Sequence, residues 1–361
     1  MKRKNVLLLL ITTTLVLGFS AILLYSCHGG GGGGSASSGA VGLYLTDDMS
    51  LFTQVTATVD KVQFVNTGSG ASCDVLLTPT AVDIAQLANV MQLVTVAQCP
   101  AVPYNRIHIE FEKSVLLTSA STGSVPGTTS LCSFVSFKDE GNMMNALSCS
   151  GTTCSLDITG AVNVFVNQQN KLALDFNLKD FEVENFGNPS TCSVTMKVSP
   201  MHAGEMDALG HPEAITGLVS GLSTTDRTFT LTRGTSSFSV LYSGITASQQ
   251  PGLDSLLQQA QTDGLRVKVM TSDIDLSTNT ITASAIFVKI GGTVSNLNTT
   301  ALTFTLTYQG GKTMTVDYTN AEVDGTLANG TEVELKLNGF DTVDYLASTV
   351  DVGDAGTSIE N

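Results

Sequence analysis

Apolar and polar residues alternate with a period of two along several stretches of the chain. In "YNRIHIEFE" the apolar positions are Ile107, Ile109 and Phe111, and charged or polar residues stand between them. This period places apolar side chains on one face of an extended strand and polar side chains on the other. Many such stretches follow one another between residues 40 and 203, so we predict an antiparallel β-sandwich with one solvated face per sheet.

Two of the alternating stretches change phase by one residue. In "VTATVDKVQF" the apolar positions move from odd to even residue numbers after Val59. "KLALDFNLKDFEVENF" changes in the opposite sense near Lys179–Asp180. An extra residue in one strand of an antiparallel pair produces such a shift. We therefore predict a β-bulge in each stretch.

Helical periodicity is confined to short segments. In "PGLDSLLQQAQTDG" apolar residues recur at intervals of three and four from Leu253 to Ala260, and Gly264 suits the end of a helix. "VDIAQLANVMQLV" is a second candidate, for a short helix that crosses one end of the sandwich. The remaining chain is rich in Thr, Ser, Val and Gly, a mixture typical of exported β-proteins.

The first half of the chain resembles a known family. The segments "GLYLTDD", "VTATVDKVQF", "VDIAQL", "RIHIEF" and "LALDFNLKDFEVENF…VTMKVSP" follow one another in a familiar order. Over residues 40 to 202 this order resembles the bacterial and archaeal lipoprotein domain catalogued as domain of unknown function 4382. The resemblance includes the polar positions Thr46-Asp47, Asp83 and Asp175, but Asp48-Met49 replaces the small residue and proline usual after Thr-Asp. It implies a surface β-domain and assigns no activity.

After residue 203 the chain contains an internal repeat. "GLVSGLSTTDRTFTLT" from Gly217 aligns with "GTVSNLNTTALTFTLT" from Gly292. Further on, "FSVLYS" aligns with "MTVDYT" and "DGLRVKV" with "NGTEVEL". Self-similarity of this kind predicts that residues 214–290 and 291–361 share one fold. Several short strands with one small helix resemble an OB-like barrel, as in a second uncharacterised family of exported repeats.

The N-terminus has the layout of an export signal. Three basic residues precede an apolar run from Val6 to Leu24, and Ser26 comes directly before Cys27. Residues 24–27 resemble the lipobox of bacterial lipoproteins, which implies a signal peptide over 1–26 and lipidation of Cys27. An uncleaved membrane-spanning helix is the alternative, because the run is just long enough. His28 at the second mature position favours the outer membrane by the same resemblance.

Residues 27–39 contain a run of six glycines followed by small polar residues. Such a composition forms no core, so we predict a flexible tether between the lipid anchor and the folded body. The signal holds three of the 17 basic residues and none of the 32 acidic ones, which leaves a mature charge of −18. A body this acidic repels nucleic acid and anionic headgroups. We therefore expect no nucleic-acid partner, and membrane contact only through the lipid anchor.

Six further cysteines all lie between residues 40 and 203, and an even number in an exported chain predicts three disulfides. Many pairings are open to six cysteines. Cys73 and Cys99 flank one insertion, and "CSGTTC" suits a short hairpin turn. A metal site is the alternative, although the Cys-x-x-Cys spacing of a zinc knuckle is missing. We predict the pairs Cys73–Cys99, Cys149–Cys154 and Cys132–Cys192.

Polar side chains crowd together between the sandwich and the repeats, in "MHAGEMDALGHPEA". Imidazole with carboxylate or thioether groups suits zinc or copper, so this segment contains the candidate metal ligands. They are His202, Glu205, Asp207 and His211. Glycines and a proline in the same segment favour a plain linker over residues 204–213.

Carboxylates also stand where strands are expected to end. The corner positions are Asp47 with Asp48, Asp273 with Asp275, Asp324, and Asp341 with Asp344. Such residues commonly cap turns through the backbone, whereas calcium would need six to eight converging oxygens. Calcium therefore remains the one cofactor that we consider, and we predict none.

Catalytic motifs are missing from the sequence. It contains no Gly-x-Ser-x-Gly elbow, P-loop, His-Glu-x-x-His helix or EF-hand loop. His108 stands between Arg106 and Glu110 on the polar face of a strand, where a cross-strand ionic pair is favoured over a lone general base. The chain contains no Trp, which counts against the aromatic platforms that sugar sites use.

Together these patterns predict an all-β, disulfide-braced β-sandwich followed by two tandem small β-barrel repeats. The predicted function is that of a lipid-anchored cell-envelope surface protein, at the outer membrane or cell surface. We expect a non-catalytic binding or structural role with an unidentified envelope or extracellular partner, and we assign no catalytic residue. The alternatives are a glycan- or matrix-binding accessory module and an unrecognised envelope enzyme.

Overall fold

The structure is a computed structural model that describes residues 37–47, 52–87, 90–119, 128–138, 144–178 and 181–352. These described residues all belong to one compact unit. The signal segment, Cys27, most of the tether and the bulge predicted near Lys179–Asp180 lie outside them. Within them, no helix combines the length and the apolar character needed to cross a bilayer.

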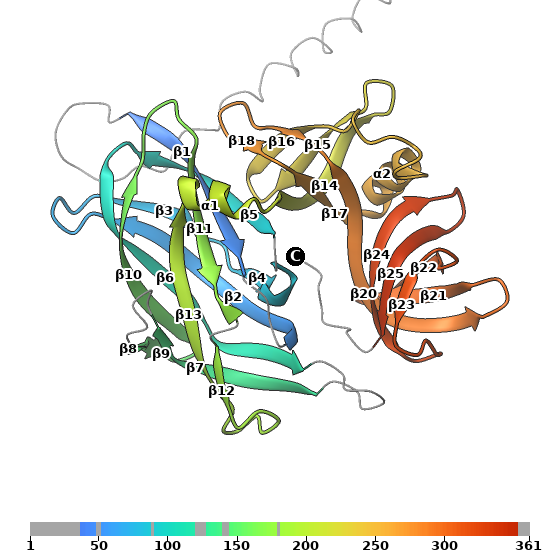
Figure 1. The fold of residues 1–361 in the computed structure, drawn as a ribbon, viewed down its shortest axis with the longest axis horizontal. Helices are drawn as coiled ribbons and strands as arrows, with labels where there is room; N and C mark the ends of the chain where they lie inside the picture. The colour runs from blue at the N-terminus through green and yellow to red at the C-terminus, as the bar shows by residue number, and fades with distance from the viewer. Residues whose placement is uncertain are drawn as a thin grey trace, which may run out of the picture. The chain divides into compact units, whose positions relative to one another are not determined.

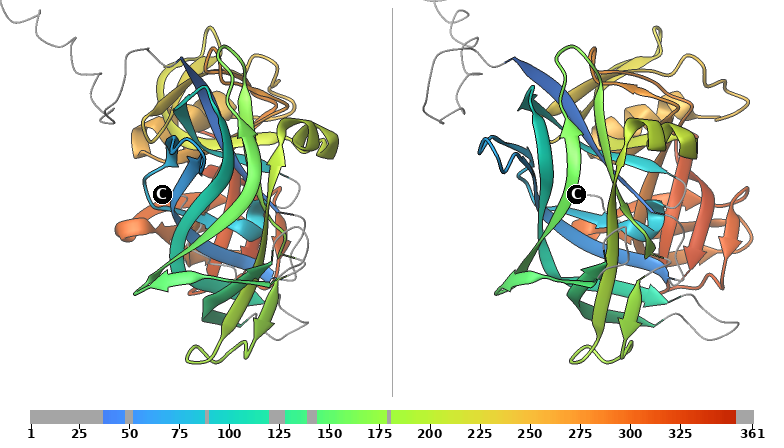
Figure 2. Two further views of the ribbon diagram at one scale, coloured as in Figure 1. Left: turned by 90° about the vertical axis from the view of Figure 1, so that its left-hand side faces the viewer. Right: turned by 60° about the vertical axis from the view of Figure 1, so that its left-hand side comes forward.

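The N-terminal half of the described chain contains two sheets that share the strand β13 (Figures 1 and 2). In the first sheet the order is β5-β1-β11-β13, and β1 runs parallel to β11. These strands are β5 (Met91–Pro100), β1 (Ser38–Thr46), β11 (Asn170–Phe176) and β13 (Ser193–His202). The first half of β13 instead pairs with β7 of the second sheet.

The second sheet is built around two long strands, β2 (Phe52–Val65) and β6 (Pro103–Ser119), which pair antiparallel. Strands β3 (Ser72–Leu76) and β4 (Thr80–Asp83) pair with β2, and β10 (Thr153–Asn163) and β7 (Thr129–Lys138) pair with β6. The short strands at its margins are β8 (Met144–Ala146), β9 (Ser148–Ser150) and β12 (Glu182–Glu184). Figure 2 shows how strongly the long strands of this half curve.

The alternating pattern fixes which side chains enter the sandwich core. Ile107, Ile109 and Phe111 are buried, whereas His108 and Glu110 between them are partly exposed. The phase change predicted after Val59 is present as two register shifts between β2 and β6, at Ala57/Val59 and Val59/Lys61. The short helix expected near residues 82–94 is a single 3-10 turn, η1 (Ile84–Leu87), after which the chain enters β5.

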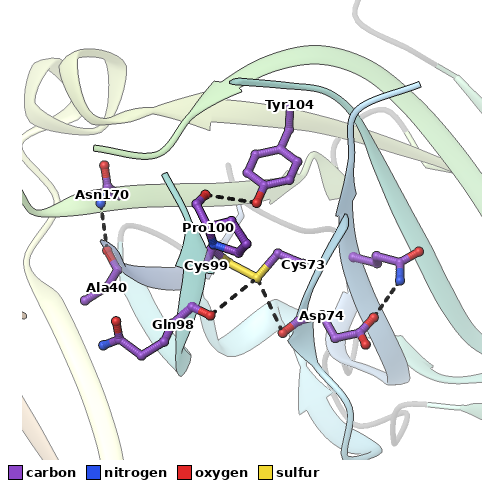
Figure 3. The surroundings of a disulfide bond; sticks show 9 residues. Ala40, Cys73, Asp74, Gln98, Cys99, Pro100, Tyr104 and Asn170 are labelled. Carbon is purple, nitrogen blue, oxygen red and sulfur yellow. Dashed lines mark hydrogen bonds between the residues drawn. A yellow bond between two sulfur atoms is a disulfide. The ribbon is translucent and has the colours of Figure 1, made fainter. Parts of the chain in front are cut away.

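All six body cysteines are paired in disulfides, in the pairs that the sequence analysis predicted. Cys73–Cys99 joins β3 to β5 and therefore links the two sheets. Figure 3 shows this bond among Gln98, Pro100 and Tyr104, with the Tyr104 hydroxyl donating to the carbonyl oxygen of Pro100 at 3.0 Å. Cys132–Cys192 ties β7 to the segment before β13. Cys149–Cys154 closes the β9–β10 hairpin.

The described residues after 212 are again mainly in strands, with one α-helix, α2 (Leu253–Asp263). In α2 the predicted stripe Leu253, Leu256, Leu257 and Ala260 is buried, and Gly264 ends the helix in the left-handed conformation. The strands of the first part are β14 (Glu213–Ser223), β15 (Thr228–Arg233), β16 (Ser236–Leu241), β17 (Arg266–Thr271), β18 (Ile274–Asp275) and β19 (Thr280–Thr282). Those of the second are β20 (Ala285–Asn298), β21 (Thr303–Tyr308), β22 (Lys312–Asp317), β23 (Glu322–Asp324), β24 (Glu332–Phe340) and β25 (Tyr345–Val352).

The two parts pair their strands in matching registers. Val219 pairs with Leu231, and Val294 with Leu306, in the strand pairs β14–β15 and β20–β21. Each of these strand pairs contains a register shift near the end of its first strand, between Ser220 and Ser223 in β14 and between Ser295 and Asn298 in β20. The parallel pairs β16–β19 and β22–β25 also correspond. In the second part the pairings close in the order β20-β21-β22-β25-β24-β20.

The boundary that the sequence suggested at residues 290/291 falls inside one continuous strand. The first residues of β20 pair with β17, and its middle pairs with β24. A 3-10 turn, η3 (Gln309–Gly311), connects β21 to β22. The helix α2 contacts β24 as well as β14 and β17. The two parts are therefore joined by a shared strand and a shared helix rather than by a loop.

The sandwich and the first part are joined in the same manner. Residues Glu213–Ile215 of β14 pair in parallel with Met91–Leu93 of β5, so the first sheet continues past the sandwich. The buried residues fall into two apolar clusters, one inside the sandwich and one within the C-terminal strands. Tyr44, Leu93 and Ala173 come from sandwich strands but belong to the second cluster. The outer side of the first sheet is thus covered by the C-terminal half.

Candidate functional site

His108 lies in a network of charges on the outer face of the second sheet. Its Nδ1 atom is 2.8 Å from Asp157 Oδ1 on β10, and its Nε2 atom is 3.3 Å from Glu110 Oε1. Lys61 of β2 continues the network, with its Nζ atom 3.7 Å from Glu110 Oε1. Arg106 Nη1 is 3.4 Å from Asp157 Oδ2. The cross-strand ionic arrangement predicted for His108 is therefore present.

This network is suited to holding strands together. Each ring nitrogen of His108 already faces a carboxylate, and the carboxylates in turn face Lys61 and Arg106. Groups this close to solvent contribute little each, about 0–1 kcal/mol per pair. Within the described part of the chain, no group of three or more His, Cys, Asp or Glu side chains is placed to hold a metal ion.

The segment with the candidate metal ligands forms a helix rather than a plain linker. Helix α1 (Ala203–Leu209) begins after His202 and ends at Gly210, which has a positive φ of 64°. Glu205 Oε2 accepts a hydrogen bond from the backbone N–H of His202 at 2.8 Å, as expected where a carboxylate caps a helix N-terminus. Buried Met206 anchors the helix to the body.

The four candidate ligands are therefore not brought together as a metal site. The Glu205 carboxylate is engaged by the helix cap, and Asp207 is exposed one position after the buried Met206. His211 lies directly after Gly210, which ends the helix, and two residues before the start of β14. The described residues offer no metal cluster in this segment.

Several of the corner carboxylates cap turns, as the turn interpretation predicts. Asp275 Oδ1 accepts from the backbone N–H and the hydroxyl of Ser277, at 2.8 Å and 2.6 Å, and Thr278 donates to the same carboxylate. The Ser277 and Thr278 hydroxyls lower the pKa of Asp275 to about 2. Asp341 accepts from the backbone N–H groups of Val343 and Asp344 in the same manner, and these bonds lower its pKa.

A polar cluster around the buried Glu213 joins residues that are far apart in the sequence. Glu213, at the start of β14, is 5% exposed. Its Oε2 atom accepts from the Tyr44 hydroxyl at 3.0 Å and from the Ile274 backbone N–H at 2.8 Å. Its Oε1 atom is 2.6 Å from Lys171 Nζ, which also lies 2.6 Å from Asp273 Oδ1. We call these five residues the junction cluster.

The junction cluster connects sandwich strands to C-terminal strands. Tyr44 belongs to β1 and Lys171 to β11, whereas Glu213 begins β14 and Asp273 follows β17. Burial, the Glu213 charge and the hydrogen bond to it raise the pKa of Tyr44 well above its ordinary value, so its hydroxyl remains a donor. Lys171 Nζ also lies 5.7 Å from the centre of the Tyr44 ring. The arrangement fixes two segments of chain against each other.

Sequence reasoning missed this cluster. In the sequence, Tyr44 stands out only as part of "GLYLTDD", and Lys171 only as one position in an alternating strand. Glu213 stood at the edge of the predicted linker. Separations of 169 and 42 residues leave no local spacing to detect. The one available signal was a glutamate directly before an apolar strand start, at Glu213-Ala214-Ile215.

A second polar contact links the sandwich to the last strands. Lys289 of β20 donates to Gln86 of η1 and to Glu334 Oε1 of β24, the latter at 2.9 Å. Glu334 is buried, and the burial of neighbouring Asp351 together with the Glu334 charge raises the pKa of Asp351. This contact, like the junction cluster, uses charged groups to join elements rather than to face a ligand.

The sandwich core contains a cavity of about 10 Å³ lined by apolar side chains, among them Phe111, Phe134 and Met196. A volume of that size holds one water molecule at most, and its apolar lining offers that water no partner. This cavity is a packing defect in the core and is too small for a small-molecule ligand.

Comparison with known proteins gives no relative: no protein-family model matches the chain, and neither does any curated protein or solved structure. The resemblance of residues 40–202 to domain of unknown function 4382 therefore remains a prediction from its motifs.

Proposed function

We propose that the chain is a lipid-anchored cell-envelope surface protein with a non-catalytic binding or structural role. The observation that carries this proposal is the pairing of all six body cysteines into three disulfides. Disulfides form and persist in exported proteins and are rare in reducing compartments. Together with the basic start, the apolar run and the Ser26-Cys27 step, they support export followed by anchoring.

The use of the polar groups supports a structural or binding role over catalysis. His108 bridges two carboxylates, Asp275 caps a turn, and Glu213 is shared among Tyr44, Lys171 and Ile274. Each of these side chains is held by partners within the protein. A catalytic acid or base needs instead a free approach to the proton that it moves.

We also propose that the C-terminal half arose by duplication into two small OB-like barrels. Phe229 packs against Tyr242 with ring centres 5.8 Å apart, and the aligned Phe304 packs against Tyr318 at 5.6 Å. Positions that align in sequence also share a positive φ, namely Gly221 with Asn296 and Arg227 with Leu302. The closing order of the second part, with one parallel strand pair, is that expected of a five-stranded OB-like barrel.

Lipid anchoring is tested by the variant Cys27→Ser. Lipidation attaches acyl chains to this residue alone, so the variant should lose the acyl mass, whereas the adjacent control His28→Ser should keep it. The intact mass of the membrane-bound wild type should correspond to a chain that starts at Cys27 and carries acyl groups. Membrane-bound wild type whose intact mass corresponds to the uncleaved chain without acyl groups would instead establish a membrane-spanning helix.

A further inference from the structure

The three disulfides differ sharply in exposure. Five of the six half-cystines are at most 6% exposed, and Cys154 is among them at 1%. Cys149 is the exception, because it lies in a run of exposed residues, Ser148–Ser150, at the end of the β9–β10 hairpin. Gly151 and Thr152 in the turn are exposed as well. The Cys149–Cys154 bond thus joins an exposed residue to a buried one.

The hairpin that this disulfide closes is peripheral. Among the described residues, β9 pairs only with β10, over three residue pairs that include Cys149 opposite Cys154. Strand β10 is held independently by β6, where Cys154 pairs with Phe111. Opening the Cys149–Cys154 bond would therefore release β9 while β10 stays in the second sheet.

The other two disulfides are placed differently. Cys73–Cys99 links the two sheets of the sandwich, and both of its half-cystines are buried. Figure 3 shows this bond close to Asp74, Gln98 and Pro100. Cys132–Cys192 closes a span of 60 residues, whereas Cys149–Cys154 closes one of 5. A thiolate must reach a sulfur atom to react with it, so the buried bonds react only after local or global opening.

We propose that Cys149–Cys154 is a thiol-exchange site, where an external small-molecule thiolate attacks Cys149 Sγ while the rest of the body stays folded. The attack forms a bond between the incoming sulfur and Cys149, and breaks the Cys149–Cys154 bond. The electron pair of the broken bond leaves on Cys154 as a thiolate, which then takes up a proton. A second thiolate, on the same dithiol or on another thiol molecule, attacks the incoming sulfur and frees Cys149. Two electrons pass from the two external thiols to the protein disulfide.

The site is tested on the mature protein under native conditions. Dithiothreitol is added at a concentration that does not unfold the protein, the reaction is quenched with acid, and free thiols are alkylated and mapped. We expect thiols at Cys149 and Cys154 at least about tenfold faster than at the other four positions. The cooperative unfolding transition should remain after this first phase. Simultaneous appearance of all six thiols, or earlier reduction of another pair, would overturn the proposal.

Two further measurements separate the site and the direction of attack from general fragility. The double variant Cys149→Ser/Cys154→Ser should lose the fast phase and keep the slow rates of the other two bonds. A persistent fast phase would place the reactive bond elsewhere. With limiting 2-mercaptoethanol, the trapped mixed disulfide should lie on Cys149, with Cys154 as the free thiol. An adduct found mainly on Cys154 would refute attack at Cys149.

Discussion

Carboxylates at neighbouring positions have different tasks, which only their surroundings distinguish. Asp273 and Asp275 are two residues apart, yet the first pairs with Lys171 and the second caps a turn. Asp275 is stabilised in its charged form by hydroxyl and backbone donors, chiefly those of Ser277 and Thr278, so its pKa is lowered to about 2.

The turn at Asp275 should therefore make stability depend on pH. A carboxyl with a depressed folded pKa adds its full stability above its unfolded pKa of about 4, and loses it as the pH falls to about 2. In Asp275→Asn this pH-dependent part should disappear, which thermal unfolding between pH 5 and 2 would measure relative to wild type. NMR titration of the wild-type Asp275 carboxyl should give the same low pKa. A midpoint near 4 would contradict the turn contacts.

The situation of Glu213 is opposite to that of Asp275, because the hydrogen-bond partners of Glu213 are buried with it. Glu213→Gln would leave the Lys171 ammonium with only Asp273 as an anionic partner in the junction cluster. Loss of one partner of a buried pair costs about 3–5 kcal/mol, and the remaining Asp273 contact places the expected loss near the lower end. Urea unfolding measures it, with Glu332→Gln at the exposed first residue of β24 as the matched control. Equal small effects for both variants would show that the cluster contributes little.

At the level of the elements, β14 and β20, the first strands of the two C-terminal parts, each bring a glycine close to a backbone carbonyl of the next strand. A Cβ atom at Gly217 of β14 would lie 2.6 Å from the carbonyl oxygen of Thr232, and one at Gly292 of β20 would lie 2.4 Å from that of Thr307. A backbone carbonyl cannot move aside to make room for a Cβ atom as a flexible side chain can. Both strands therefore need glycine where they pair with their neighbours, β14 with β15 and β20 with β21.

Gly217→Ala and Gly292→Ala should consequently destabilise the protein by similar amounts, about 1–3 kcal/mol each, as overpacking typically does. The control Gly204→Ala lies in α1 with no atom near its would-be Cβ, and should be neutral or slightly stabilising. Thermal or urea unfolding compares the three variants. A marked loss in only one of the two strand variants would argue against the proposed duplication.

At the scale of the whole molecule, the sheet shared by the sandwich and the C-terminal half changes the expected result of truncating the chain. The sequence alone predicts that the cysteine-bearing half folds without residues 214–361, since none of its disulfides or strand motifs lies there. The structure pairs β14 with the edge of β5 and covers Tyr44 and Leu93 with C-terminal side chains. An uncovered edge strand beside exposed apolar residues favours association.

A chain that ends at residue 212 should therefore form its three disulfides but self-associate, in contrast to the full body. Thiol mapping and light scattering measure the two properties separately. The double variant Tyr44→Ser/Leu93→Ser in the same truncated chain should reduce the association, because it removes apolar surface that the C-terminal half covers. A monomeric, cooperatively folding truncated chain would show that the two halves are independent.

The sequence by itself determined the features that depend on local spacing. Alternation set the strands and their buried faces, as at Ile107 and Ile109, and the helical stripe from Leu253 to Ala260 set α2. The predicted export signal and the cysteine spacing suggested the three disulfides. These properties were accessible because period and turn chemistry act over a few residues.

Only the tertiary structure decided how these elements meet. The junction of Glu213 with Tyr44 and Lys171 joins positions 169 and 42 residues apart, and the pairing of β14 with β5 extends one sheet across the expected linker. No period or motif encodes such contacts. They arise because a buried charge needs a partner and an open strand edge needs another strand or segment to cover it. In this fold, segments that are distant in the sequence supply both.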